Sequence, residues 1–208
     1  MSPRAFFSSF RAYFTAPFLG LSLAGCLSDE PAGEGDNGGG GGKSAEISFE
    51  AVKAPEGAKT FTGNGITFNY PERYDNVEVD DNAVGVFIHI MKTAGPDELM
   101  DETLTTITLM KREWQTAEEV RKEYLDGNNK HSSDKGEEAT RKLMGADAVG
   151  YTVASSTGSG PIVQHSYYLD LEHVGMILNV EYIESLSQDP KVYPDVAMVI
   201  DSLRGAKK

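Results

Sequence analysis

The side chains best suited to chemistry in this sequence are two histidines, His89 and His165. A histidine can act as an acid, a base or a metal ligand near neutral pH, but a usable site needs partners that converge on it. Each histidine instead lies in an alternating apolar run, where His89 shares a face with Phe87 and His165 shares one with Tyr167. We therefore predict that neither is catalytic or binds a metal, and that packing accounts for both.

Two polar segments match part of a ligand-binding motif. Residues 155–160 (Ser-Ser-Thr-Gly-Ser-Gly) have the glycines of a phosphate loop without its lysine or its following helix, so a hairpin turn is predicted. Residues 126–130 (Asp-Gly-Asn-Asn-Lys) begin like a calcium loop, but Lys130 stands where an oxygen ligand is needed. We predict a helix C-cap there. A G-x-S-x-G motif is absent as well, so the sequence predicts no catalytic residue, no cofactor site and no enzyme.

The single cysteine, Cys26, stands at the end of an N-terminal signal pattern. Arg4 and Arg11 are the only charges before it, and the mostly apolar run from Tyr13 to Leu23 is too short to cross a membrane comfortably. This is the pattern of a cleavable secretory signal over residues 1–25.

The boundary Leu23-Ala24-Gly25-Cys26 resembles a bacterial lipobox. The resemblance implies that a signal peptidase cleaves before Cys26, that its thiol receives a diacylglycerol, and that the new amino group is acylated. Several acyl chains anchor a protein stably, whereas one chain does so only marginally. The alternative is an ordinary secretory signal with an incidental cysteine. An exported chain with one cysteine cannot form an internal disulfide, however, and lipidation explains where that cysteine stands.

A linker follows the proposed anchor over residues 26–46. It is rich in Gly, Asp, Glu and Ser, with glycine at 38–42, so it has little to bury and is predicted to be disordered. The nineteen residues from Leu27 to Ala45 span roughly 25 Å as a flexible coil. Leu27 and Ser28 stand where an aspartate would retain many lipoproteins at the inner membrane. The family rule therefore implies the outer membrane in a diderm host.

The net charge and the length of the remaining chain limit its possible partners and its number of domains. Residues 1–25 hold two arginines and no acid, so the rest carries 17 basic and 32 acidic side chains, a formal charge of −15. Nucleic acid is an unsuitable partner for such a surface, because phosphate binding needs clustered Lys and Arg. Residues 47–208 are long enough for one domain with a core that needs neither disulfides nor a metal.

Period-two alternation of apolar residues predicts strands through most of this domain. They are expected near residues 66–70, 77–79, 84–91, 103–110, 139–144, 149–154, 162–171 and 176–183. Both faces of 84–91 are largely apolar, which predicts a central strand covered above and below. Short turn segments such as Gly145-Ala146-Asp147 join successive strands and predict antiparallel neighbours.

Two segments have helical periodicity instead. Thr116 and Glu119 have the spacing of a capping box, and the helix that they begin is predicted to stop at Gly127-Asn128. A second helix over residues 192–203 is expected to begin near Asp189-Pro190 or Tyr193-Pro194. The predicted fold is α+β, with an antiparallel sheet of about six to seven strands flanked by helices.

Three features of this domain resemble the PsbP-like superfamily, which includes photosystem PsbP proteins, Ran-binding Mog proteins and bacterial DcrB-type lipoproteins. They are the stretch Gly65–Pro71 (GITFNYP), the helix after the first strands, and residues 167–171 (YYLDL) followed by a helix ending in 200–204 (IDSLR). The resemblance covers about residues 61–204 and implies an α/β/α sandwich. It departs from the family where a tryptophan commonly follows Pro71, since this chain has Tyr74 there and its only tryptophan at Trp114.

Members of the superfamily mostly act as binding or assembly subunits, although a fold alone does not fix a function. The sequence and the resemblance together predict a lipid-anchored envelope protein that binds a protein partner. The alternative is a carrier or sensor of a small ligand, either a lipid or a metal ion. An enclosed apolar cavity would favour the carrier, and a flat exposed aromatic or apolar patch would favour the protein partner. Tyr167, Tyr168 and Tyr182 could form such a patch, but their places in strands favour packing within the sheet.

Overall fold

The computed structural model describes residues 46–94, 102–111, 115–157, 160–185 and 192–206. These residues contain strands β1 to β10 and helices α1 and α2, which confirms an α+β fold made mostly of antiparallel sheet. The signal segment and Cys26 lie outside the described residues. None of the helices found in the described ranges is both long enough and apolar enough to span a bilayer.

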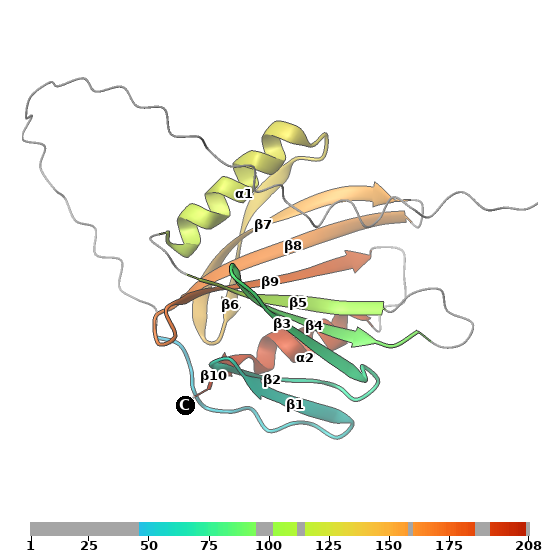
Figure 1. The fold of residues 1–208 in the computed structure, drawn as a ribbon. Coiled ribbons are helices and arrows are strands. Elements are labelled where there is room, and N and C mark those ends of the chain that lie inside the picture. Colours follow the sequence, from blue (N-terminus) through green and yellow to red (C-terminus); the bar gives the residue numbers. More distant parts are fainter. Residues whose placement is uncertain (1–45, 95–101, 112–114, 158–159, 186–191, 207–208) are drawn as a thin grey trace, which may run out of the picture. The chain divides into compact units, whose positions relative to one another are not determined.

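Seven strands form one antiparallel sheet in the order β3-β4-β5-β9-β8-β7-β6 (Figure 1). Their bounds are β3 Asn76–Asp81, β4 Gly85–Lys92, β5 Glu102–Lys111, β6 Gly136–Leu143, β7 Ala146–Thr157, β8 Gly160–Leu171 and β9 Met176–Ser185. The prediction that residues 84–91 form a central strand was wrong, because β4 lies one strand from the edge and β9 lies in the middle. In β4, Val86, Ile88 and Ile90 are buried, whereas Phe87, His89 and Met91 on the other face are only partly buried.

The large sheet has seven strands, as predicted, but a second sheet of three strands was not predicted. It contains β1 (Ala58–Gly63), β2 (Ile66–Pro71) and β10 (Arg204–Gly205), in the order β1-β2-β10. Asn64 and Gly65, both with positive φ, form the two-residue turn between β1 and β2. Strand β2 therefore pairs with β1 in a hairpin and with β10, which is far away in the sequence. The alternation of residues within β2 could not reveal those partners.

Helix α1 (Ala117–His131) begins as predicted and ends later than predicted. The capping box of Thr116 and Glu119 is formed, and the Asp170 carboxylate on β8 also accepts a hydrogen bond from the Ala117 amide. The predicted stop and C-cap at Gly127-Asn128 were wrong, because the helix continues to His131. A Cβ at Gly127 would meet nothing within 4 Å, so this glycine lies in an open helical position and does not break the helix.

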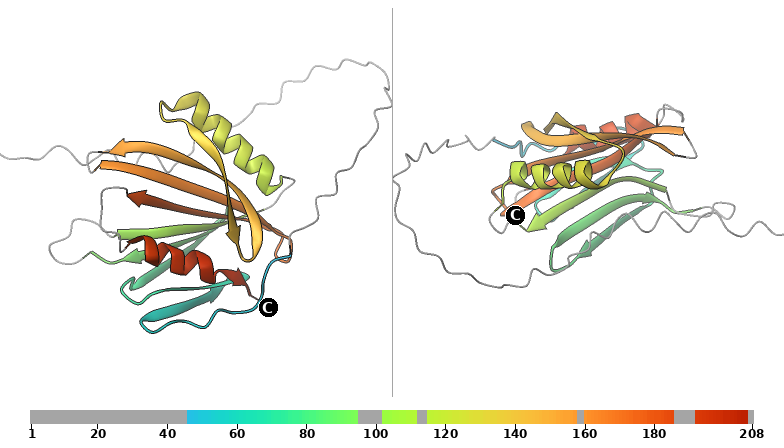
Figure 2. Two further views of the ribbon diagram at one scale, coloured as in Figure 1. Left: turned by 180° about the vertical axis from the view of Figure 1, so that it is seen from behind. Right: turned by 90° about the horizontal axis from the view of Figure 1, so that it is seen from above.

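Helix α2 (Val192–Ser202) and helix α1 lie on opposite faces of the large sheet, as the two views of Figure 2 show. The helix begins close to the second of the two predicted starts; the first, Asp189-Pro190, falls outside the described residues. Val196, Val199 and Ile200 are buried on its inner side. Ser202 Oγ accepts a hydrogen bond from the Asn69 amide at 2.8 Å, which ties the end of α2 to β2.

The two faces of the large sheet have different packing. On the α2 side, side chains of both sheets and of α2 form one large apolar cluster that includes Phe68, Ile88, Val180 and Val199. On the α1 side, a smaller cluster of Ala117, Val120, Leu125 and neighbouring residues of β7 to β9 lies under the helix. The main core therefore lies on the α2 side, and only part of the α1 side is covered by apolar packing.

Candidate binding site on the α1 face of the sheet

The two candidate histidines lie on opposite faces of the large sheet. His89 on β4 pairs with Thr106 on β5, and its Nδ1 is 3.2 Å from Thr106 Oγ1. Thr106 in turn pairs with Glu181 on β9. His165 on β8 pairs with Tyr182, which is the next residue of β9. Successive side chains of a strand point to opposite faces, so the sheet separates the two imidazoles. They do not share a site.

His165 belongs to a stack of rings on the α2 face. Its ring lies 4.4 Å from that of Tyr182, its Nε2 is 3.1 Å from Glu184 Oε2, and its Nδ1 is 3.3 Å from the Tyr167 hydroxyl. Arg141 donates a hydrogen bond to the Tyr182 hydroxyl at 2.8 Å. Burial lowers the pKa of His165, and the hydrogen bond and charge of Glu184 oppose that shift. Both ring nitrogens of His165 are therefore engaged within this stack.

The three tyrosines considered as one aromatic patch are divided between the two faces. Tyr167 and Tyr182 stack with His165 on the α2 side. Tyr168 lies on the α1 side, where its ring is 6.1 Å from that of Tyr124 and 6.4 Å from that of Tyr151. The prediction of packing within the sheet fits the burial of all three side chains.

The strand register places a line of polar side chains across the α1 face, one from each strand. We call it the polar row. From edge to edge of the sheet, its members are Glu78, His89, Thr106, Glu181, Ser166, Tyr151 and Glu138. On the other face, the adjoining row of Val79, Ile88, Ile107 and Val180 is apolar. Apolar side chains at these positions would stabilise the sheet more than polar ones do. The polar row is therefore a candidate functional site.

Glu181 is the middle member of the polar row and its most unusual residue. Ser166 Oγ, which is fully buried, donates to Glu181 Oε1 at 3.0 Å. Among the described residues, Ser166 is the one side chain whose hydrogen bond acts on the pKa of this carboxylate. Burial raises the pKa of Glu181, while the Ser166 hydrogen bond acts in the opposite direction. Ionised carboxylates in such surroundings are normally paired.

Replacing Glu181 with glutamine should stabilise the domain at neutral pH. A raised pKa means that the folded state binds the proton more tightly than the unfolded state, so wild-type stability falls as pH rises from about 4.5 through the folded-state pKa. Above that window Glu181→Gln should be more stable by about 1.4 kcal/mol for each unit of the shift, and at lower pH the difference should vanish. Urea unfolding across this pH range measures the effect. Glu78→Gln, at the exposed end of the same row, is the control. Equal stabilities of wild type and Glu181→Gln at every pH would contradict the prediction.

Three tyrosines gather on the α1 face of the sheet, with the ring of Tyr168 stacked against those of Tyr124 and Tyr151. Tyr124 comes from α1 and is 47% exposed, whereas Tyr168 and Tyr151 are buried. Side-chain hydrogen bonds join Tyr151 to Ser166 and to Tyr168. Burial raises the pKa of each of the three phenols, and the negative charge of Glu181 adds to the shift. The α1 face therefore combines one partly buried carboxylate, whose pKa is raised, with phenols whose pKa values are also raised.

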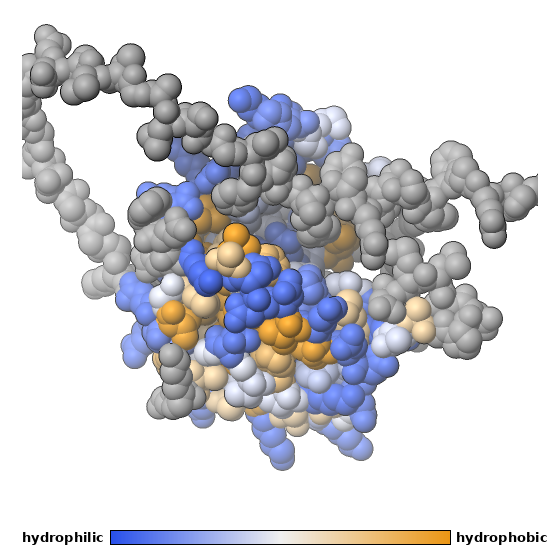
Figure 3. All heavy atoms as spheres, viewed as in Figure 1, coloured by the Kyte–Doolittle hydropathy of each residue, from blue (hydrophilic) through white to orange (hydrophobic). Residues whose placement is uncertain are grey.

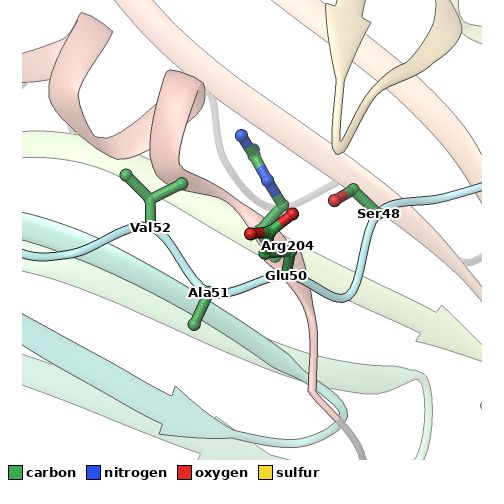
Figure 4. A pocket seen from close by; sticks show the side chains of 5 residues that line it. All are labelled: Ser48, Glu50, Ala51, Val52 and Arg204. Atoms are coloured by element: carbon green, nitrogen blue, oxygen red, sulfur yellow. The ribbon is translucent and has the colours of Figure 1, made fainter.

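Two open clefts occur elsewhere on the surface, and neither is an enclosed apolar cavity. One, of about 250 Å³, is lined by Ser48, Glu50, Ala51, Val52 and Arg204 (Figure 4). The other, of about 320 Å³, lies between α1 and strands β6 and β7. There Arg121 donates hydrogen bonds to Glu118 and Glu138, so its charge is already matched by acids of the same cleft. Seen from the α1 side, the described surface is mostly hydrophilic, with small apolar groups between hydrophilic ones (Figure 3).

Within the described ranges, no three His, Cys, Asp or Glu side chains lie close enough together to hold a metal ion. Glu181 and Tyr124 were not singled out from the sequence. A signal was present, because Asn179 and Glu181 are alternate polar residues in the mostly apolar run 176–183 and must share one face. Their neighbours across the sheet came only from the pairing of β9 with β5 and β8.

Comparisons with known proteins do not assign the chain to a family. No protein-family model matches it, and no curated protein matches it. A chain of Bacteroides thetaiotaomicron VPI-5482, with a crystal structure at 1.50 Å resolution, is similar with 13% identity and a TM-score of 0.41. The match covers 73% of this chain and 50% of that one, so this chain spans about half the length of that structure. At this TM-score the likeness does not establish a shared fold.

Proposed function

We propose that this protein is an extracytoplasmic lipoprotein, anchored through acyl chains on Cys26, whose domain binds a partner protein and catalyses no reaction. The observation that carries the anchor is the sequence Leu23-Ala24-Gly25-Cys26 at the end of an apolar segment. The glycine-rich linker would let the domain turn freely at the membrane surface. By the rule for the residues after the cysteine, the anchor is placed in the outer membrane of a diderm host.

A protein partner agrees better with the surface of the domain than a small-molecule carrier does. The two clefts described above are open, and charged side chains take part in lining both, whereas carriers of lipids enclose their ligand in an apolar cavity. The side chain of Tyr124 on α1, which is 47% exposed, instead offers an aromatic contact at the surface. Aromatic residues of this kind are enriched where proteins bind one another.

We further propose that the domain is a PsbP-like α/β/α sandwich. Helices on opposite faces of one antiparallel sheet support this assignment. The three-stranded sheet beside α2 is an addition to the simple sandwich that the resemblance implies. Non-catalytic binding is the role that the same resemblance would predict.

Changing Cys26 to serine tests the anchor. The protein should move from the membrane fraction to the soluble exported fraction, because acylation needs the thiol and the domain has no part in attachment. Cell fractionation and mass spectrometry of the intact protein measure the result. The melting temperature of the domain should not change. A membrane-bound Cys26→Ser protein, or an unmodified Cys26 in the wild type, would contradict the proposal.

Chemical cross-linking in intact envelopes tests the partner. If the protein binds a specific partner, wild-type protein at its native expression level should give one reproducible cross-linked species. That species should be lost when the domain that follows the linker is deleted. Recovery of only random abundant envelope proteins would argue against a binding module.

A further inference from the structure

We propose that two copies of this chain associate through β6, with the two β6 strands antiparallel and the two large sheets joined edge to edge. The contact is with a second copy of the same chain, so it goes beyond the proposed binding of a different partner and does not depend on the lipid anchor. It is supported by an open sheet edge, by the order of charges along that edge, and by the contrast with the opposite edge.

The first observation is that β6 is an open edge of the large sheet. Strand β6 ends the strand order, and among the described residues only β7 pairs with it. Glu138, Thr140 and Lys142 are exposed, and no proline interrupts the strand. An uninterrupted edge strand of this kind can pair with a further strand through its unpaired N–H and C=O groups.

The hairpin between β6 and β7 shows which backbone groups are available. Met144 and Gly145, both with positive φ, form a two-residue turn, and such a turn makes the flanking Leu143 and Ala146 a hydrogen-bonded pair. Hydrogen-bonded and non-hydrogen-bonded pairs alternate along an antiparallel ladder. The even-numbered residues of β6, from 136 to 142, therefore direct their N–H and C=O groups away from β7.

The second observation is the order of charges along β6. Glu137 and Glu138 come before Arg141 and Lys142, so an antiparallel copy brings the acids of one chain opposite the bases of the other. A two-fold axis at Thr140 places Glu138 opposite Lys142 of the second copy, and the same contact occurs twice. Each of these residues is one of those whose backbone groups point outward, so the charge pairs and the new ladder agree in register.

An axis at Ala139 is the neighbouring register that the same backbone groups allow. It would place Glu137 opposite Arg141 of the second copy. Arg141 already donates a hydrogen bond to the Tyr182 hydroxyl of its own chain at 2.8 Å, and its side chain is only 20% exposed. The register with the axis at Thr140 uses a more accessible base and is therefore favoured.

Glu138 and Lys142 are both accessible to a second strand. The side chain of Lys142 is 68% exposed, and its ion pair with the equally exposed Asp147 is of the surface kind that contributes little to stability. The side chain of Glu138 is 73% exposed although it accepts a hydrogen bond from Arg121. A charge of the second copy can therefore reach each of them without displacing a buried contact.

The third observation comes from β3, the opposite edge of the large sheet. Its charged residues are Glu78, Asp80 and Asp81, and it contains no base. Two antiparallel copies of β3 would bring these acids together, and like charges opposite one another destabilise a strand pair. Strand β3 therefore has the charge of an edge that is protected from association, whereas the charges of β6 match a second copy of β6.

Sedimentation equilibrium of the mature chain, residues 26–208, tests the pairing under reducing conditions, which prevent a disulfide between two Cys26 side chains. Wild type should be a dimer in equilibrium with monomer. Lys142→Glu opposes two acids across the edge and Glu138→Lys opposes two bases, so each should weaken dimerisation about tenfold or more. The first variant makes the net charge more negative and the second makes it less negative, so a shared effect cannot come from net charge.

An equimolar mixture of these two variants restores an acid opposite a base at both contacts. The mixture should therefore dimerise within about threefold of the wild-type affinity, which would also show that both variants are folded. Glu78→Lys makes the same change at the other end of the polar row and should alter the affinity by less than about twofold.

Thr140→Pro tests the backbone contact independently of charge. The substitution removes an outward N–H and leaves the ladder with β7 complete, as edge strands tolerate. It should give a monomer with the circular dichroism spectrum of wild type.

Three results would overturn the inference. A wild-type chain that stays monomeric up to its highest soluble concentration lacks the contact. Dimers that persist in both charge variants or in Thr140→Pro use another surface. Folded charge variants that stay monomeric when mixed would reject pairing of Glu138 with Lys142 of the second copy. The purified chain contains no other protein, so each of these results leaves the proposed binding of a different partner to the cross-linking in envelopes.

Discussion

Ile88→Ala should lower the free energy of unfolding by about 2–5 kcal/mol, because it removes buried methyl groups and leaves a cavity that the sheet cannot close. Ile88 on β4 has no exposed surface and belongs to the main core on the α2 side. Its neighbours across the sheet are Val79 on β3 and Ile107 on β5. Urea unfolding measured by far-ultraviolet circular dichroism gives the free energy.

Two control variants belong to this experiment. Val79→Ala removes methyl groups from the cross-strand partner of Ile88, but Val79 is 43% exposed on the edge strand and should cost far less. Glu78→Ala, exposed on the same strand, should change stability little. Similar unfolding midpoints for Ile88→Ala and Glu78→Ala would contradict the placement of Ile88 in the main core.

Gly150→Ala should destabilise the domain by at least about 3 kcal/mol, the upper end of the usual cost of overpacking. A Cβ at Gly150 on β7 would lie 2.3 Å from the Ser166 carbonyl oxygen and 2.5 Å from Tyr167 Cδ1. The ring of Tyr167 lies over this glycine, its cross-strand partner, and the β8 backbone cannot retreat without breaking the ladder. The melting temperature should fall by about 2–4 °C for each kcal/mol.

Gly127→Ala is the matched substitution with the opposite expected sign. Nothing lies within 4 Å of a Cβ at Gly127, which sits inside α1 with helical neighbours on both sides. Alanine should therefore stabilise the domain by about 0.5–1 kcal/mol through the lower entropy of the unfolded chain and better helix propensity. Destabilisation by Gly127→Ala, or a neutral Gly150→Ala, would argue against the placement of these two glycines.

Local signals in the sequence predicted several elements well. The capping box at Thr116 was visible as two residue types at fixed spacing, and it formed because it satisfies amides of the first helical turn without help from other elements. The strand near Pro71 ended there because proline has no amide to donate to a ladder. Alternation placed His89 with Phe87 and His165 with Tyr167, and these faces were correct because period two is a property of a single strand.

The errors share one physical origin, which is that local preference was outweighed by tertiary contacts. Gly127 and Asn128 favour a helix end, but Asn128 Nδ2 donates to the Asp134 carbonyl and the Asn129 side chain contacts Gly136, which connects the last turn of α1 to β6. The helix therefore gains from continuing to His131. In the same way, β2 pairs with β1 and β10 in a separate sheet and does not join the large one.

The sequence by itself determined the signal pattern, the position of the single cysteine, the α+β class and the face on which each strand residue lies. These features depend on residue type and short-range spacing, so they can be obtained from one strand or one helix at a time. Only the tertiary structure decided that β5 and β8 flank β9, and this order brings Thr106 and Ser166 to either side of Glu181. It also stacked Tyr124 of α1 against Tyr168 of β8. Pairing order depends on the free energy of the whole packed domain, and no single strand carries that information.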